Sequence, residues 1–282
     1  MSPVHALEQL RYVARGWAVG DEFPVQEVAA VLAELADENP ASVLQACRRL
    51  IEYFPATGRV WWLSARALSA ADAVEGIWEA ADELARDPTG RHLADSLSDR
   101  GAIAVIAPSR SVVAALRRRP DLVLRKKARG ADLVVVPALA AGPAAVLVGE
   151  RVGAVAANAR RAGQVLWVVA ERGVVLPEPL WAQLRDRALG SGPEGAAGAA
   201  GAAGGTARTG GAARTAGVAG GAARAAGVAG GAAGAAGAAG GVVVLASTDV
   251  GLLVGEKGPA PAAEVLSTPT CPPVAELLGW KS

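Results

Sequence analysis

The chain has 282 residues, of which 52% are hydrophobic and only 4% are aromatic, and its formal net charge is +1. This length can bury a substantial core, either as one large domain or as two small ones. A nearly neutral chain has no overall field that would attract nucleic acid or an acidic membrane, so we expect no direct nucleic-acid binding. Two cysteines, Cys47 and Cys271, are too few for a disulfide framework and lack metal-ligand spacing, which favours a cytoplasmic protein without a metal.

Residues 1–95 are predicted to form a helical domain. Apolar residues recur at i, i+3 and i+4 in the segments VQEVAAVLAELADE, ASVLQACRRLIEYF and AADAVEGIWEAADELARD. The pair Asp87 and Pro88 ends the last of these helices or caps the next one. Trp61 and Trp62 are explained either by buried aromatic packing or by a place in the wall of a pocket.

Residues 96–189 are predicted to be the first part of a Rossmann-like domain. The runs AIAVIA, LVVV and QVLWVVA alternate with the helical segments SVVAALRRR and RVGAVAANARRAG. This order is typical of a mostly parallel sheet covered by helices, so the expected fold class is α/β. The uncharged stretch 133–149 approaches the length of a membrane span, but Pro137, Gly142 and Pro143 interrupt it. We interpret it as a buried strand, a loop and a second apolar piece, and expect no membrane span.

Residues 190–241 are almost entirely Gly and Ala. Such a tract has no large side chains to bury, and glycine raises the entropic cost of ordering it, so we expect a disordered insertion. Residues 242–282 then return to the Rossmann-like domain, with short apolar strands expected at 242–245 and 250–254.

A candidate ligand site lies at the string APSRS, residues 107–111, between the first predicted strand and a helix. A chain that leaves a strand and begins a helix exposes backbone N–H groups at the positive end of the helix dipole, where a phosphate or a carboxylate can bind. Ser109 and Ser111 would add hydroxyl donors. The same serines could instead serve only as caps of the helix, and the sequence leaves both readings open.

Other charged residues give weaker signals. The cations at 117–119 and 125–129 are interpreted as a solvated basic face rather than as a binding patch. Glu150 and Asp249 are the acids beside strand ends that could take part in chemistry, and neither has an evident partner. No dinucleotide-binding, P-loop or nucleophile-elbow motif occurs at a suitable place, so we expect no cofactor.

Three stretches of the chain resemble the signature blocks of a known family in order and spacing. They are SLSDRGAIAVIAPSRSVVAALRRRPDL, GADLVVVPALAAG and GERVGAVAANARRAGQVLWVVAE. The family is that of the translation initiation factor 2B alpha/beta/delta subunits, which includes sugar-phosphate aldose–ketose isomerases such as methylthioribose-1-phosphate isomerase. The resemblance covers roughly two-thirds of the chain, and it implies a helical domain followed by a Rossmann-like sheet.

The resemblance also implies roles for single residues. Ser109 falls where the isomerases have a catalytic cysteine and the regulatory subunits a serine, and Leu139 falls where the isomerases have a catalytic aspartate. Serine and leucine cannot supply the acid/base pair that proton shuttling needs. The segment 116–132 is too short for the strand–helix–strand–helix unit found there in the family, which implies a reduced sheet and an inactive or remodelled pocket.

We therefore expect a non-catalytic, regulatory or ligand-binding protein, and the resemblance implies that it forms a homodimer through its sheet domain. The expected ligand is a sugar phosphate or a nucleotide, and the residues expected to bind it are Ser109, Arg110, Ser111, Arg151 and Gly153. Two alternatives remain open: an active sugar-phosphate isomerase with Glu150 as base, and a scaffold whose Gly/Ala tract contacts a partner protein.

Overall fold

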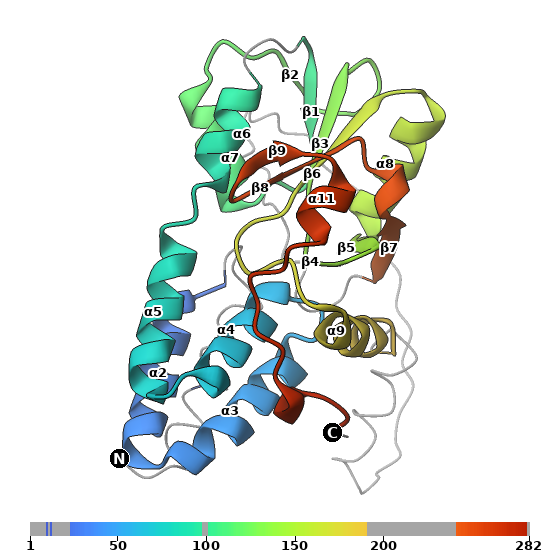
Figure 1. Ribbon diagram of the computed structural model, residues 1–282. Coiled ribbons are helices and arrows are strands. Elements are labelled where there is room, and N and C mark those ends of the chain that lie inside the picture. Colours follow the sequence, from blue (N-terminus) through green and yellow to red (C-terminus); the bar gives the residue numbers. More distant parts are fainter. Residues whose placement is uncertain (1–9, 11, 13–22, 98–100, 191–240, 281–282) are drawn as a thin grey trace, which may run out of the picture.

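The computed structural model describes residues 10, 12, 23–97, 101–190 and 241–280, and these form a helical lobe below an α/β lobe (Figure 1). The expected insertion, residues 190–241, lies almost entirely outside the described residues. The bounds of the first helices are α2 (Val25–Glu38), α3 (Pro40–Tyr53), α4 (Gly58–Ser69) and α5 (Ala73–Ala85). Asn39 caps α3 by accepting the N–H of Ala41 at 3.2 Å, and Asp72 caps α5 by accepting the N–H of Glu75 at 3.0 Å.

The core of the helical lobe contains Trp61 and Trp62, which are 0% and 1% exposed. The packing interpretation of this pair is therefore confirmed. Helix α9 (Glu178–Gly190) joins the same core through Leu180, Trp181 and Leu184, although it follows the sheet strands in the chain.

The C-terminal segment also returns to the helical lobe after the sheet is complete (Figure 1). Cys271 and Leu277 are buried in the helical core, the latter within the short helix η3 (Ala275–Leu277). The guanidinium carbons of Arg48 and Arg187 lie 5.5 and 3.8 Å from the ring centre of Trp280. This segment thus ties the sheet lobe to the helices by both apolar and cation–π contacts.

The main sheet has the strand order β2-β1-β3-β6-β8-β9 and is parallel except for its last pair. Its strands are β1 (Ile103–Val105), β2 (Leu124–Arg125), β3 (Leu133–Pro137), β6 (Val165–Val169), β8 (Leu252–Gly255) and β9 (Gly258–Ala260). Leu133 and Val135 pack under α6 (Thr89–Ser96) and α7 (Arg110–Arg118). Val134 and Val136 pack under α8 (Glu150–Arg161) and α11 (Ala262–Leu266) on the opposite face. The sequence prediction of an α/β fold with a mostly parallel, helix-covered sheet is confirmed.

A second, antiparallel sheet contains β4 (Ala140–Gly142), β5 (Ala145–Gly149) and β7 (Val242–Ala246). The loop expected within residues 133–149 is thus largely a hairpin, whose two-residue turn contains Pro143. The two expected C-terminal strands exist, but they belong to different sheets, with the turn η2 (Ser247–Asp249) between them. Among the helices of the described residues, none has the length and apolarity needed to cross a membrane.

Candidate functional site

The turn between β1 and α7 bends sharply before the helix begins. Ala107 has a φ of 48°, in the left-handed region that residues other than glycine seldom adopt. Ser109 is the N-cap of α7, and its Oγ accepts the N–H of Val112 at a long distance of 3.5 Å. The capping role expected for Ser109 is therefore present, and Ser111 follows in the first turn of the helix.

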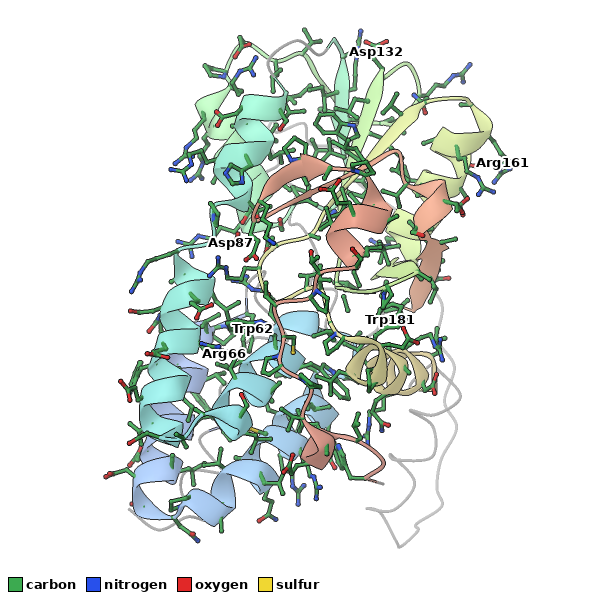
Figure 2. All side chains as sticks on the ribbon, viewed as in Figure 1. Trp62, Arg66, Asp87, Asp132, Arg161 and Trp181 are labelled. Atoms are coloured by element: carbon green, nitrogen blue, oxygen red, sulfur yellow. The ribbon has the colours of Figure 1, made fainter. Side chains whose placement is uncertain are left out.

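A cavity of about 750 Å³ lies between this helix and the helical lobe. Its walls come from the start of α2, from α4, from the linker between α5 and α6, and from one side of α7. Five arginines line it, namely Arg59, Arg86, Arg91, Arg110 and Arg118. The carboxylates in its wall are Glu27 and Asp87, and Figure 2 shows Asp87 at the junction of the two lobes. The cavity wall therefore carries more positive than negative charge.

The first turns of three helices also contribute to the cavity wall. Gln26 of α2, Gly90 of α6 and Ser111 of α7 all line it. The residues that precede α2 and α6 are Pro24 and Pro88, and neither supplies a side-chain cap, although Asp87 Oδ1 accepts the N–H of Thr89 at the start of α6 at 3.0 Å. Because the first turn of a helix has several N–H groups without intrahelical acceptors, the N–H groups that these side chains leave unpaired favour a bound anion.

Several of the arginines are already engaged. Arg59 lies 3.3 Å from a carboxylate oxygen of Glu171 and donates to the carbonyl of Leu84 at 3.2 Å. Arg86 pairs with Asp82 one turn earlier in α5. In the described part of the chain, Arg91 and Arg118 have no ion-pair partner, and both are exposed. These two guanidinium groups are the cations best able to reach a ligand.

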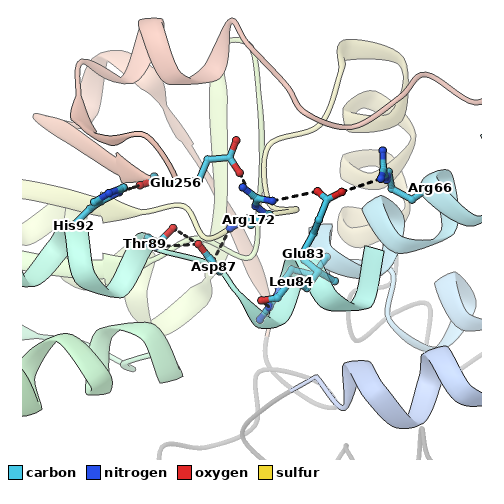
Figure 3. Close-up of polar contacts among 10 residues, drawn as sticks. Arg66, Glu83, Leu84, Asp87, Thr89, His92, Arg172 and Glu256 are labelled. Atoms are coloured by element: carbon cyan, nitrogen blue, oxygen red, sulfur yellow. Dashed lines mark hydrogen bonds and ion pairs between the residues drawn. The ribbon is translucent and has the colours of Figure 1, made fainter. Parts of the chain in front are cut away.

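A network of ion pairs lies next to the cavity, at the carboxyl ends of β6 and β8 (Figure 3). Arg172 contacts Glu83 of α5 at 3.1 Å and Glu256 at 2.7 Å. Its backbone N–H donates to Asp87 Oδ2 at 2.8 Å, while Oδ1 of Asp87 accepts the hydroxyl of Thr89 at 2.6 Å. Ligands of open α/β sheets usually bind at this edge. Here charged side chains fill part of the edge, and the open space lies beside α7.

The remaining predicted site residues lie elsewhere. Glu150 and Arg151 begin α8, on the face of the sheet opposite α7, and both are exposed. Gly153 packs on β7, since a Cβ at this position would lie 2.8 Å from Cβ of Val243. The carbonyl of Leu139 accepts the N–H of Gly58 at 2.8 Å. The structure therefore brings Arg110 and Ser111 to the cavity, but not Arg151 and Gly153.

The two cysteines are poor candidates for chemistry. Burial raises the pKa of the Cys47 thiol and of the Cys271 thiol to about 12 in each case. A thiol with such a pKa is almost never a thiolate near neutral pH, so neither side chain is a ready nucleophile or metal ligand. Within the described ranges, no group of three or more His, Cys, Asp or Glu side chains could hold a metal ion.

Sequence reasoning missed most of the arginines that line the cavity. Arg59 and Arg86 come from the helical lobe and its linker, and the contact between the lobes brings them to α7, whereas Arg91 reaches the cavity because α6 packs beside α7. One signal was available: Arg110, Ala114 and Arg118 recur at helical spacing and share the cavity side of α7.

No family model matches the sequence, and a search of curated proteins finds no similar sequence. Solved structures do match. The translation initiation factor eIF-2B of Pyrococcus horikoshii OT3 is 14% identical, with a TM-score of 0.50 over 58% of this chain and 78% of that one. The eIF2B beta subunit of Chaetomium thermophilum is 12% identical, with a TM-score of 0.54 over 94% of this chain and 90% of that one.

The 5-methylthioribose 1-phosphate isomerase of P. horikoshii OT3 is also similar, at 12% identity and a TM-score of 0.48 over 92% of this chain and 86% of that one. At a TM-score below 0.5, that likeness adds nothing to the fold assignment. The match to the eIF2B beta subunit covers 94% of this chain and therefore includes both lobes. The chain therefore has the fold of the translation initiation factor 2B subunits.

Proposed function

We propose that this chain is a non-catalytic, regulatory protein that binds a sugar phosphate or a nucleotide in the cavity between its lobes. The observation that carries the proposal is that five arginines and three helix N-terminal turns surround one cavity. Its volume of about 750 Å³ suits a ligand of this size. A phosphate dianion would meet guanidinium groups and backbone N–H donors together, which is a favourable arrangement for charge-assisted hydrogen bonds.

The carboxylates of the cavity favour binding over proton transfer. Both oxygens of Asp87 already accept hydrogen bonds, from Thr89 and from the N–H of Arg172. Glu27 lies on the exposed first turn of α2, and Glu150 lies on α8 across the sheet. The described cavity wall thus lacks the pair of free acid and base groups that aldose–ketose isomerisation requires. We also propose that the protein is cytoplasmic and forms a homodimer through the sheet lobe, which light scattering during gel filtration would test.

The matched variants Arg118→Gln and Arg117→Gln test the site. Both residues are exposed on α7, but only Arg118 lines the cavity. Calorimetric titration with ribose 5-phosphate and with AMP should show about a tenfold or greater loss of affinity for Arg118→Gln, since a hydrogen bond to a charged group is worth about 1.5–3 kcal/mol. Arg117→Gln should stay within about twofold of the parent. Equal losses in both variants, or no binding by the parent protein, would overturn the proposed site.

The non-catalytic part of the proposal has its own test. The parent protein is incubated with aldose phosphates, and conversion to the ketose is followed by NMR. We expect no conversion. Turnover that disappears in Glu150→Gln would instead establish the alternative in which this exposed carboxylate is the base.

A further inference from the structure

The main sheet ends at the short strand β2, which within the described residues pairs only with β1. The side chains of Val123 and Leu124 are 56% and 53% exposed there. An edge strand that carries exposed aliphatic side chains is a template for pairing with another chain, and proteins usually cover or shorten such edges. This edge is short, and no described element covers its apolar surface.

The backbone of β2 leaves polar groups on its outer side. The N–H of Ile103 donates to the carbonyl of Val123 at 2.9 Å, which directs that carbonyl toward β1. In a parallel ladder, the peptide groups of successive residues alternate between the two sides of a strand. The N–H and C=O of Leu124 therefore point away from β1, where an added strand would meet them.

Positive charge is concentrated around the same edge. Residues 117–129 contain seven cations and one acid, Asp121, although the whole chain carries a net charge of only +1. Hydrogen bonding from Arg119 holds the pKa of Asp121 below its ordinary value, so this carboxylate already has a cation as its partner. In the described part of the chain, the exposed cations without an ion-pair partner that flank β2, apart from Arg118 in the cavity wall, are Arg117, Arg125, Lys126, Lys127 and Arg129.

We propose that the edge of β2 docks an extended, acidic segment of a partner protein. The backbone of that segment pairs with Leu124, its apolar side chains cover Val123 and Leu124, and its carboxylates meet the flanking cations. Under this proposal the cations that the sequence indicates as a solvated face have a partner, and the adjacent exposed residues Val123 and Leu124 lie among them.

Other polyanions fit the edge less well. Residues 117–129 contain no aromatic side chain, so the stacking that retains single-stranded RNA has no platform there. A lipid surface would attract the cations, but it offers no row of peptide groups to pair with the strand edge. The docking proposal is independent of the ligand in the cavity, since it uses a different set of side chains.

Fluorescence anisotropy with a labelled peptide of alternating Glu and Val tests the proposal, with a Gln and Val peptide as the neutral control. The double variant Lys126→Glu/Lys127→Glu should lose affinity for the acidic peptide by about tenfold or more. The matched variant Arg151→Glu/Arg161→Glu makes the same charge change at exposed residues of α8 and should stay within about twofold. In the parent protein, the bound peptide should also slow hydrogen exchange at the Leu124 amide.

Three results would overturn the proposal. One is equal binding of the neutral peptide, and another is an equal loss in both charge-reversed variants. The third is binding of oligouridine or of phosphatidylserine vesicles by a parent protein that does not bind the acidic peptide.

Discussion

Arg172 joins the two lobes, and replacing it with methionine should destabilise the protein by about 2 kcal/mol. Methionine keeps an unbranched apolar side chain in place of the arginine stem but removes the guanidinium group and its charge. The Arg172→Met variant loses the ion pairs to Glu83 at 3.1 Å and to Glu256 at 2.7 Å. It retains the hydrogen bond from the backbone of residue 172 to Asp87, so the cavity wall is not directly altered.

The magnitude follows from the burial of the two carboxylates. An exposed ion pair contributes about 0–1 kcal/mol, whereas removing one partner of a fully buried pair costs about 3–5 kcal/mol. The side chain of Glu83 is 37% exposed and that of Glu256 is 18% exposed, so this pair of contacts falls between those limits. Solvent screens the first contact more than the second, and most of the loss is expected from Glu256.

Urea unfolding followed by tryptophan fluorescence measures the effect. The midpoint should fall while the slope of free energy against urea stays constant, and Tm should drop by about 4–8 °C. Arg161→Met is the control, because the side chain of Arg161 is exposed on α8 and, among the described residues, its one hydrogen bond is from Nε to a carbonyl one turn earlier, at 3.3 Å. Combining Arg172→Met with Glu256→Gln should cost less than the sum of the single losses. Equal destabilisation by the Arg172 and Arg161 variants would refute this account of the junction.

Three further predictions concern packing and protonation. Gly142→Ala should lower the free energy of unfolding by about 2 kcal/mol or more and so lower the urea midpoint, because the new Cβ would lie 2.1 Å from a ring atom of Trp181. An unchanged midpoint would contradict that contact. Trp280→Ala should lose about 2–3 kcal/mol in the same assay, since the ring contacts a guanidinium at 3.8 Å and is half-buried; a loss below about 0.5 kcal/mol would show that the C-terminal contact is weak. Burial raises the pKa values of the Cys47 and Cys271 thiols to about 12 in the folded state. Their contribution to the free energy of unfolding is therefore complete below about pH 9. It is lost progressively between about pH 9 and 12, where the thiols ionise in the unfolded chain but not in the folded one. Replacing both cysteines with alanine should flatten that decline in unfolding free energy, and an unchanged pH profile would argue against the burial of the thiols.

Strands made of consecutive β-branched residues could be predicted from the sequence. Strands that form only because a neighbouring strand pairs with them could not. The β-branched run of β3 (Leu133–Pro137) is buried along most of its length and was predicted as a strand. By contrast, β4 (Ala140–Gly142) contains only Ala and Gly, which have little preference for strands, and it exists because β5 pairs with it. β2 (Leu124–Arg125) has two residues within a basic segment, too few for any periodicity to show.

Some residues of the candidate site could likewise be predicted from the sequence, and others could not. Arg110 and Ser111 could be found because they are adjacent in sequence and follow a strand directly. Arg91 could not be linked to them, since it reaches the cavity through the packing of α6 beside α7. That packing is close because Gly90 has no side chain: a Cβ there would lie 2.8 Å from the carbonyl oxygen of Ser111. A contact between residues that are far apart in the sequence leaves no local pattern from which it could be predicted.

The return of the C-terminal segment to the helical lobe has a consequence for the order of events during synthesis. Helices α2 to α5 leave the ribosome early, but the core that they share also contains Leu180 and Trp181 of α9, and Cys271 and Leu277 near the end of the described chain. Their apolar surfaces therefore remain partly uncovered while some two hundred further residues are translated. Such a nascent chain is exposed to aggregation and is a natural client for chaperones. Ribosome-bound chains stalled before residue 271 should accordingly be more sensitive to protease in the helical region than chains released after completion.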